Sequence, residues 1–487
     1  MSLREKTISG VMWSAADSFA SQAVNFVVMV VLARILMPRE FGLMGMTAIF
    51  IAISATFVNS GLASALIRKK DCSQADYATV FYYNLGMGVL FYAILFLSAG
   101  AIAGFFDEPL VKPMVRVLGL DLIIRSLSII QNTRLVKRID FRQLAKVSVT
   151  ASVLSGAIGI LMALQGYGVW SLVARMVAAA AFTTALLWLW NRWWPSAGFS
   201  RESFKELFGF GSKLLASSLL DTVAKNIYQL VIGRFYAAQD LGFYTQAKMF
   251  KDVPAVKISQ VTGRVTYPVL SEIRDEPERL KKGYRHVISI TTFLSFSVMA
   301  LMAATAEPLI ITLIGEKWRT SILYLQMLCF VGMMYPLHAT NLNMLKVQGR
   351  SDLFLKLELI KKLLIVPAVL TGIFYGIVPM IGVMMINNVI AYFLNSSWSG
   401  RLVSYPVAEQ LRDVYPAFLV AVIAGAAVYL AAGLMPFGYT GLLIAQLLLG
   451  GLLIVLISEG LRLSSYLQVK EIAASKIKSL INRKSTS

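Results

Sequence analysis

The sequence predicts an all-α, polytopic membrane protein with about fourteen transmembrane helices, arranged as two parallel six-helix bundles and two extra C-terminal helices. Composition is the first reason, because 57% of the 487 residues are hydrophobic and only 15% are charged. The mean hydropathy is +0.68. A soluble protein of this length needs more polar surface than that. The placement of positive charge and an internal repeat are the second and third reasons.

Apolar segments of about 20 residues are long enough to cross a bilayer as helices. They follow one another along this chain with short connections, so no separate soluble domain is expected. The first segment follows basic residues as a secretory signal does, but it runs on for roughly 28 residues and lacks a small-residue cleavage site, so it is predicted to be a retained helix. The fourteen predicted helices cover residues 8–37, 41–66, 77–104, 113–132, 147–165, 168–190, 207–233, 241–268, 286–305, 321–345, 357–376, 378–399, 414–433 and 439–458.

Lysine and arginine concentrate in alternate connections, as expected when basic loops remain in the cytoplasm. The connections after even-numbered helices hold clusters such as residues 68–70, 134–146 and 274–285. Both termini are therefore predicted to be cytoplasmic, and the net charge of +20 is assigned to membrane topology rather than to nucleic acid binding. The connections after odd-numbered helices hold Arg34, Arg39, Lys112, Arg234, Lys317 and Arg319.

An internal repeat relates the two halves of the chain. Residues 31–50 align without gaps on residues 231–250, and the alignment pairs Gly42 with Gly242. Each copy lies at the turn between the first and second helix of a six-helix set. Because six is even, the two sets are predicted to be parallel repeats. The predicted divisions are residues 1–200 and 201–405 for the bundles, and 406–487 for two extra helices and a basic amphipathic tail.

Ionisable side chains inside a membrane helix are costly, and they usually face a bundle interior or a wet cavity. The helices predicted at residues 207–233 and 241–268 carry the most charge. On the first of them, Asp221 and Lys225 are spaced i and i+4, where two side chains meet on one face. A structural ion pair is the ordinary interpretation of this spacing, and a place in a substrate cavity is the functional one.

The second of these helices carries two groups of cations. Lys248 and Lys251 lie near mid-depth on one side, whereas Lys257 and Arg264 lie on the opposite side. Pro254 stands between the groups and is expected to kink the helix. The cations are predicted to line a cavity, and snorkelling or internal pairing is the alternative.

Other predicted helices carry isolated charges. Asp121 and Arg125 again have the i, i+4 spacing of an ion pair, but Arg175 has no carboxylate within four residues. Asp17 lies alone among serines, which makes it a candidate proton or cation coupling site unless it pairs across helices. Because intramembrane cations outnumber anions, the predicted cavity suits an anionic substrate, and phosphate is the anion that lysine and arginine most often bind.

Signatures of chemistry are missing from the sequence. There is no G-x-x-x-x-G-K-[ST] loop and no nucleophile elbow with triad partners. His286 and His338 have no metal-ligand motif around them, and Cys72 and Cys329 are too far apart to imply a disulfide framework. The sequence therefore predicts neither an enzyme nor a metal or other cofactor.

Three stretches resemble a known family. They are LARILMPREFGLMGM at residues 32–46, NSGLASALIRKKD at 59–71 and DLGFYTQAKMFKDVPAVKISQVTGRVTYPVLSEIRDE at 240–276. The chain resembles the bacterial lipid-linked oligosaccharide flippases of the O-antigen, capsule and colanic-acid type. These form the polysaccharide-synthesis branch of the multidrug, oligosaccharidyl-lipid and polysaccharide exporter (MOP) superfamily.

This resemblance implies a flippase that moves an undecaprenyl-pyrophosphate-linked oligosaccharide across the inner membrane by alternating access, for surface polysaccharide biosynthesis. It implies membrane lipids and polysaccharide polymerase or export proteins as partners. A peptidoglycan-precursor flippase and a drug or cation antiporter of the same superfamily are the alternatives. Substrate contacts are expected at Lys225, Lys248, Lys251, Arg125, Arg175, Lys257 and Arg264, and coupling at Asp17 and Asp221.

Overall fold

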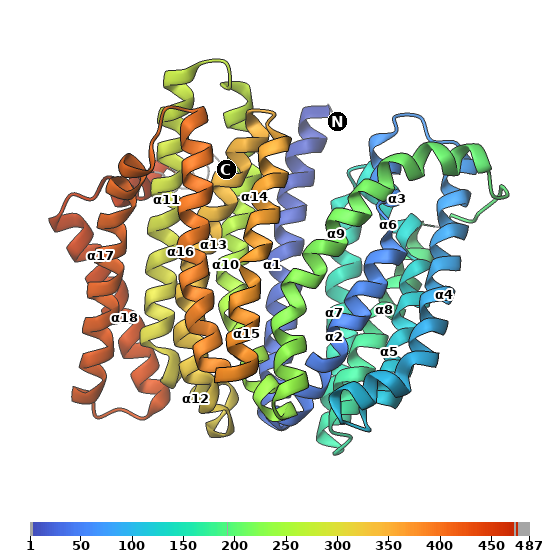
Figure 1. Cartoon of the computed structure of the whole chain (residues 1–487), viewed down its shortest axis with the longest axis horizontal. Coiled ribbons are helices and arrows are strands. Elements are labelled where there is room, and N and C mark those ends of the chain that lie inside the picture. Colours follow the sequence, from blue (N-terminus) through green and yellow to red (C-terminus); the bar gives the residue numbers. More distant parts are fainter. Residues whose placement is uncertain (1–2, 192, 472–473, 476–487) are drawn as a thin grey trace, which may run out of the picture. The chain divides into compact units, whose positions relative to one another are not determined.

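The regular structure of the described chain is helical (Figure 1). The computed structural model describes residues 3–191, 193–471 and 474–475, without the side chains of residues 3–12, 14–18 and 265. Two compact units divide the chain, Met1–Thr245 (unit 1) and Gln246–Ser487 (unit 2). Residues 472–473 and 476–487 of the predicted amphipathic tail lie outside the described ones.

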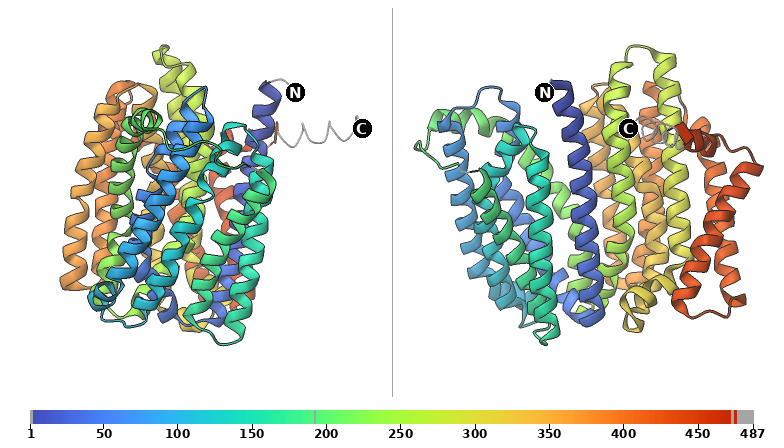
Figure 2. Two further views of the ribbon diagram at one scale, coloured as in Figure 1. Left: turned by 90° about the vertical axis from the view of Figure 1, so that its right-hand side faces the viewer. Right: turned by 180° about the vertical axis from the view of Figure 1, so that it is seen from behind.

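Unit 1 is a bundle of long helices joined by short turns. Its elements are α1 (Leu3–Ile35), α2 (Pro38–Asn59), α3 (Leu62–Arg68), α4 (Gln74–Phe106), α5 (Val111–Ser126), α6 (Ile129–Lys137), α7 (Phe141–Leu164), α8 (Val169–Asn191), α9 (Arg201–Phe235) and the start of α10 (Ala238–Glu272). Helix α7 packs between α1 and α8, and α2 packs against α5 and α9. Figure 2 shows these helices running side by side.

Unit 2 contains the rest of α10 and the C-terminal helices. Its elements are α11 (Pro277–Ala304), α12 (Ala306–Ile314), η1 (Glu316–Trp318), α13 (Thr320–Val347), α14 (Ser351–Leu363), α15 (Ile365–Tyr375), α16 (Ile377–Leu402), α17 (Val407–Ala431), η2 (Ala432–Leu434) and α18 (Tyr439–Gly460). Helix α11 packs against α13 and α17, and α13 also packs against α16. The last two long helices, α17 and α18, contact each other as an antiparallel pair (Figure 2).

Each of the fourteen predicted helices coincides with one helix or with two consecutive ones. In the described part of the chain, nine helical stretches are long and apolar enough to cross a membrane. The other predicted spans are charged, as in α9 and α10, or divided, as in α5–α6 and α14–α15, while α1 contributes the shorter apolar stretch Phe19–Ile35. The prediction of an all-α polytopic membrane protein is confirmed.

Three predicted helices are each broken in two, for local reasons. Gly61 has a φ of +70°, a left-handed conformation that separates α2 from α3. Ser128 donates from both its backbone N–H and its hydroxyl to the Arg125 carbonyl, which ends α5. Pro367, which has no N–H, lies just after the break at Leu364.

The short helix α12 lies in a stretch that was predicted to be a connection. It is a nine-residue apolar segment, and Ala306, Ile310 and Ile314 within it are fully buried. Its length is well below the roughly 20 residues of a membrane span, so a search for spans passes over it. It packs against α13 and α18 inside unit 2.

The two copies of the internal repeat meet inside unit 1, at the starts of α2 and α10. A Cβ added to Gly42 would lie 1.6 Å from the Ala238 carbonyl oxygen, and one added to Gly242 would lie 1.9 Å from the Pro38 carbonyl oxygen. Pro38 and Ala238 are themselves equivalent positions of the repeat. The glycines that the alignment pairs are therefore in reciprocal contact, and the close approach of the two backbones requires glycine at both positions.

Candidate functional site

Unit 1 contains a cavity of about 340 Å³ whose wall is apolar except for two arginines and two neutral polar side chains. Arg125 enters from α5 and Arg175 from α8. The sequence places them 50 residues apart, and the packing of α5 against α8 brings them to one space. The other lining residues are Met29, Phe41, Met44, Gly45, Ala48, Leu172, Met176, Ala179, Gln229 and Thr245.

Arg175 is held by neutral acceptors. Its Nη2 donates to Asn25 Oδ1 at 2.7 Å, and its Nη1 contacts Met29 Sδ at 2.8 Å. The Asn25 amide nitrogen donates to the Ser21 carbonyl at 2.9 Å, which turns the amide oxygen towards the guanidinium. The buried Nε of Arg175 has no hydrogen-bond partner among the described residues. A thioether is a weak acceptor, so this guanidinium keeps donor capacity that an anion would use.

Arg125 forms the ion pair that its spacing from Asp121 predicted. Arg125 Nε lies 2.7 Å from Asp121 Oδ2, and the carboxylate side chain is 2% exposed whereas the arginine side chain is 48% exposed. The buried acid therefore fixes one edge of the guanidinium, while its other edge remains accessible. Because Asp121 balances the charge of Arg125, the net positive charge of this pair of arginines comes from Arg175.

The remaining predicted residues of unit 1 lie on α1 and α9. Lys225 is exposed and Asp221 is half-buried, both on α9. The side chain of Asp17 lies outside the described residues. None of these three lines the cavity around Arg125 and Arg175, as far as the described lining residues show.

Lys248, Lys251, Lys257 and Arg264 belong to the part of α10 in unit 2, so a common cavity with the residues of unit 1 stays a prediction. Lys251 is 9% exposed and forms an ion pair with Asp252. A Cβ at Gly332 would lie 2.9 Å from its Cγ and Cδ, so the glycine leaves space for the lysine stem. Lys248 and Lys257 are half-buried and Arg264 is exposed.

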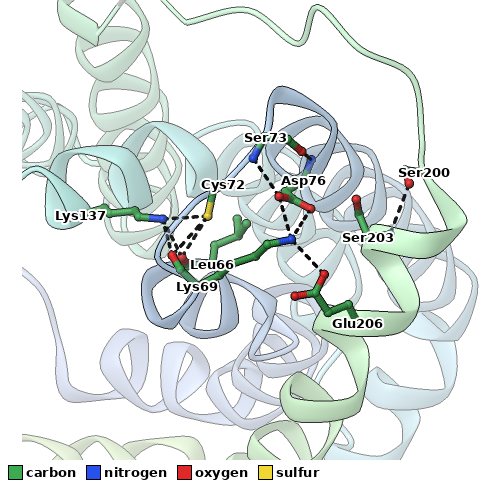
Figure 3. A network of polar contacts seen from close by, with 9 residues as sticks. All are labelled: Leu66, Lys69, Cys72, Ser73, Asp76, Lys137, Ser200, Ser203 and Glu206. Carbon is green, nitrogen blue, oxygen red and sulfur yellow. Dashed lines mark hydrogen bonds and ion pairs between the residues drawn. The ribbon is translucent and has the colours of Figure 1, made fainter.

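A polar network at one end of unit 1 was not predicted from the sequence (Figure 3). Lys69 Nζ lies 3.0 Å from Asp76 Oδ2 and 2.9 Å from Glu206 Oε2. Lys137 Nζ donates to the Lys69 carbonyl at 2.5 Å and lies 2.7 Å from Cys72 Sγ. Residues that were interpreted only as topology-setting charge therefore also connect α3, α4, α6 and α9.

Three curated relatives are similar to this chain. The lipopolysaccharide biosynthesis protein WzxC of Escherichia coli K12 is 27% identical over 405 residues, which cover 81% of this chain and 82% of WzxC. The teichuronic acid biosynthesis protein TuaB of Bacillus subtilis 168 is 25% identical, covering 72% and 73% of the two chains. The succinoglycan biosynthesis transport protein ExoT of Rhizobium meliloti 1021 is 28% identical, covering 64% of each.

Solved structures share the fold. The lipid II flippase MurJ in an inward closed conformation has a TM-score of 0.75 at 13% identity, covering 92% of this chain and 98% of MurJ. An inward-facing MATE multidrug resistance transporter of the MOP superfamily has a TM-score of 0.62 at 17% identity, covering 79% and 94%. The chain is thus a multi-pass membrane protein with the fold of MOP transporters. A family model described as polysaccharide biosynthesis protein matches residues 31–323, more than half of the sequence, and the chain belongs to that family.

Proposed function

We propose that this protein is a flippase that moves an undecaprenyl-pyrophosphate-linked oligosaccharide across the inner membrane for surface polysaccharide biosynthesis. Membership of the polysaccharide biosynthesis family and similarity to WzxC, TuaB and ExoT support the class of substrate. The fold shared with MOP transporters supports transport by alternating access. The protein would move its substrate without changing it chemically.

The observation that carries this proposal is the pair of arginines in the cavity of unit 1. A pyrophosphate loses its hydration when it enters the membrane interior, and that loss is costly unless cations replace the water. Guanidinium groups donate two parallel hydrogen bonds to phosphate oxygens. Arg175 has an unused donor and Arg125 has an accessible edge, so together they offer such contacts within an apolar wall. A cationic drug would meet repulsion there, which disfavours the antiporter.

The proposal also gives roles to the other residues predicted from the sequence. Lys225, Lys248, Lys251, Lys257 and Arg264 would add positive charge along the substrate path. Asp17 and Asp221 would serve coupling. The six-helix bundles at residues 1–200 and 201–405 would rock against each other, with 406–487 as an addition and both termini cytoplasmic. A polysaccharide polymerase or export protein would receive the flipped substrate.

Complementation of a glycan-export null strain tests the arginine cavity. We expect Arg175→Gln and Arg125→Gln each to reduce surface polysaccharide at least about tenfold, the effect of losing one charged contact worth about 1.4 kcal/mol or more. Arg116→Gln is the matched control: it also lies on α5, but its guanidinium stacks on Phe96, 4.2 Å from the ring centroid, outside the cavity.

Membrane abundance of each variant is measured in parallel, so that loss of protein is not read as loss of transport. Full polysaccharide export by both arginine variants would remove the proposed phosphate contacts. Rescue of viability in a strain lacking its peptidoglycan-precursor flippase, without rescue of surface polysaccharide, would favour the peptidoglycan alternative instead.

A further inference from the structure

His338 lies on α13 in unit 2, between two asparagine amides of α16. Its Nε2 is 3.3 Å from Asn388 Oδ1, and its Nδ1 is 3.2 Å from Asn395 Nδ2. Asn388 and Asn395 are seven residues apart, which is two helical turns, so they project from the same face of α16. Helix α16 therefore supplies the hydrogen-bond partners of both ring nitrogens of a histidine that lies on α13.

The hydrogen bonds define which ring nitrogen carries the proton. Asn388 Nδ2 donates to the Met384 carbonyl at 2.8 Å, so the amide oxygen of Asn388 faces the ring as an acceptor. Nε2 must then carry a hydrogen. Nδ1 accepts from the Asn395 amide nitrogen, so it carries none. His338 is held as the neutral Nε2–H tautomer.

Asn395 provides the means to hold a second proton. Its side chain is buried at 1% exposure, and its Oδ1 has no hydrogen-bond partner among the described residues. A half-turn of this amide would present Oδ1 to Nδ1, where it could accept a hydrogen bond from a protonated ring. In either orientation, one end of the amide faces the ring, and the other end lies at the place that Oδ1 now occupies without a hydrogen-bond partner. The half-turn therefore leaves the amide NH2 group without a partner in place of Oδ1.

The charged group that acts on His338 is itself paired. Lys361 of α14 is the ammonium that acts on the ring, and it forms an ion pair with Glu358 at 2.5 Å. At the first turn of α13, Arg319 pairs with carboxylates of the preceding elements. Titratable groups on the elements packed near α13 include Tyr284 of α11, Tyr392 of α16, Lys251 and Asp252 of α10, Glu358 and Lys361 of α14, Glu307 of α12 and Glu316 of η1.

We propose that His338 is a proton-binding site within the helices of unit 2, and that a proton taken up at Nδ1 turns the Asn395 amide. Ser396, the next residue, accepts from Asn341 of α13 at 3.1 Å and donates to Gln410 of α17 at 2.8 Å. A rotation of the Asn395 amide therefore takes place next to the hydrogen bonds that join α13, α16 and α17. Protonation is thereby linked to the packing of these helices, whatever substrate the protein moves.

Nuclear magnetic resonance of the full-length protein, labelled with ¹⁵N in its histidine rings and held in lipid nanodiscs, tests the site. The chain has two histidines, so His338→Gln assigns the spectrum and His286→Gln is the matched control. At pH 7.5 we expect the His338 signals of a neutral ring with its proton on Nε2. As the pH falls, Nδ1 becomes protonated while the protein stays folded, and His286→Gln leaves that titration unchanged.

Substitutions at Asn395 separate this proposal from a purely structural histidine. A carboxylate beside Nδ1 stabilises the protonated ring, so Asn395→Asp should raise the proton affinity of His338 about tenfold or more. Asn395→Leu removes the acceptor and should lower it. Asn395→Ser, whose hydroxyl both donates and accepts, should keep the titration, and it serves if Asn395→Asp does not fold.

Two results would overturn the proposal. One is a His338 ring that stays neutral in the wild-type protein at every pH at which it remains folded. The other is a titration that none of the Asn395 variants shifts. The measurement requires no transport, so its failure leaves the flippase proposal untouched, and failure of complementation by the arginine variants leaves this site untouched.

Discussion

An arginine within the membrane requires hydrogen-bond acceptors, and Arg175 obtains them from neutral groups. Gly159 of α7 leaves room for the arginine stem, because a Cβ there would lie 2.9 Å from the Arg175 Cβ. Asn25 supplies the one strong acceptor, at 2.7 Å. Neutral partners leave the positive charge in the cavity, whereas a carboxylate partner would cancel it. This distinguishes Arg175 from Arg125, which is paired with Asp121.

Asn25→Leu tests whether the hydrogen bond that Arg175 donates to Asn25 stabilises the fold. The substitution keeps the side-chain volume but removes the acceptor, so the folded state should lose about 1–2 kcal/mol, the range for a hydrogen bond to a charged group between membrane helices. Ser152→Ala, which removes only the 3.3 Å contact to the Asn25 amide nitrogen, is the control and should cost about 0.5 kcal/mol or less. Denaturant unfolding in detergent measures both, and equal losses would contradict this role of Asn25.

Lys69 predicts a pH dependence at the end of the same unit. The hydrogen bond that the Lys69 ammonium donates to the Glu206 carboxylate, together with the one it donates to Asp76, raises the pKa of Lys69 above its ordinary value of 10.5, against the opposing effect of burial. A raised pKa means that the ammonium stabilises the fold at pH values below 10.5, and that this contribution disappears as the pH rises through the folded-state pKa. The stability advantage of the wild type over Lys69→Met should therefore be constant near neutral pH and decline above pH 10.5.

The control for this prediction is Lys70→Met, which changes the neighbouring lysine in the same connection. Its effect on thermal unfolding should be within about 0.5 kcal/mol, as for an ordinary surface substitution. An advantage of Lys69 that grows with rising pH would show that the ion pairs of Figure 3 do not stabilise the fold.

Among the elements, the crossing of α2 and α10 has the least tolerance for change. Gly42→Ala would place a Cβ 1.6 Å from the Ala238 carbonyl oxygen, and a backbone atom cannot move aside as a flexible side chain can. The substitution should cost about 3 kcal/mol or more, because overpacking against a fixed backbone exceeds the usual 1–3 kcal/mol. Gly242→Ala should have a similar effect, because its contact with Pro38 is the reciprocal one.

Gly86→Ala provides the control for the crossing. Gly86 lies within α4, and a Cβ there would meet no atom within 4 Å. Alanine has a higher helix propensity than glycine, so this variant should be as stable as the wild type or more so, by up to about 1 kcal/mol. Thermal unfolding of the three variants decides the matter: a Gly42→Ala protein as stable as Gly86→Ala would refute the close approach.

The elements were largely predictable from the sequence because a membrane helix is recognised by its length and hydropathy alone. All fourteen predicted spans contain helix, whereas the breaks at Gly61 and Leu364 depend on backbone conformation that hydropathy does not report. The ion pair of Asp121 with Arg125 followed from a local spacing. The meeting of Arg125 and Arg175 could not be predicted, because it depends on how α5 packs against α8.

For the whole molecule, the distribution of lysine and arginine predicts one orientation in the membrane. An even number of spans returns the C-terminus to the side of the N-terminus, and the basic connections assign that side to the cytoplasm. Two exposed connection residues report on opposite sides: Tyr167, between α7 and α8, is 55% exposed, and Arg274, between α10 and α11, has a side chain that is 62% exposed.

Cysteine labelling in whole cells tests this topology. In a background in which Cys72 and Cys329, both free thiols, are replaced by serine, Tyr167→Cys should react with a membrane-impermeant maleimide once the outer membrane is opened. Arg274→Cys should react only after the inner membrane is also opened, because the connection that holds it is basic and is therefore predicted to be cytoplasmic. The reverse labelling pattern would mean that the protein has the opposite orientation in the membrane. Labelling of both residues from one side would mean that the number of spans between them is even rather than odd.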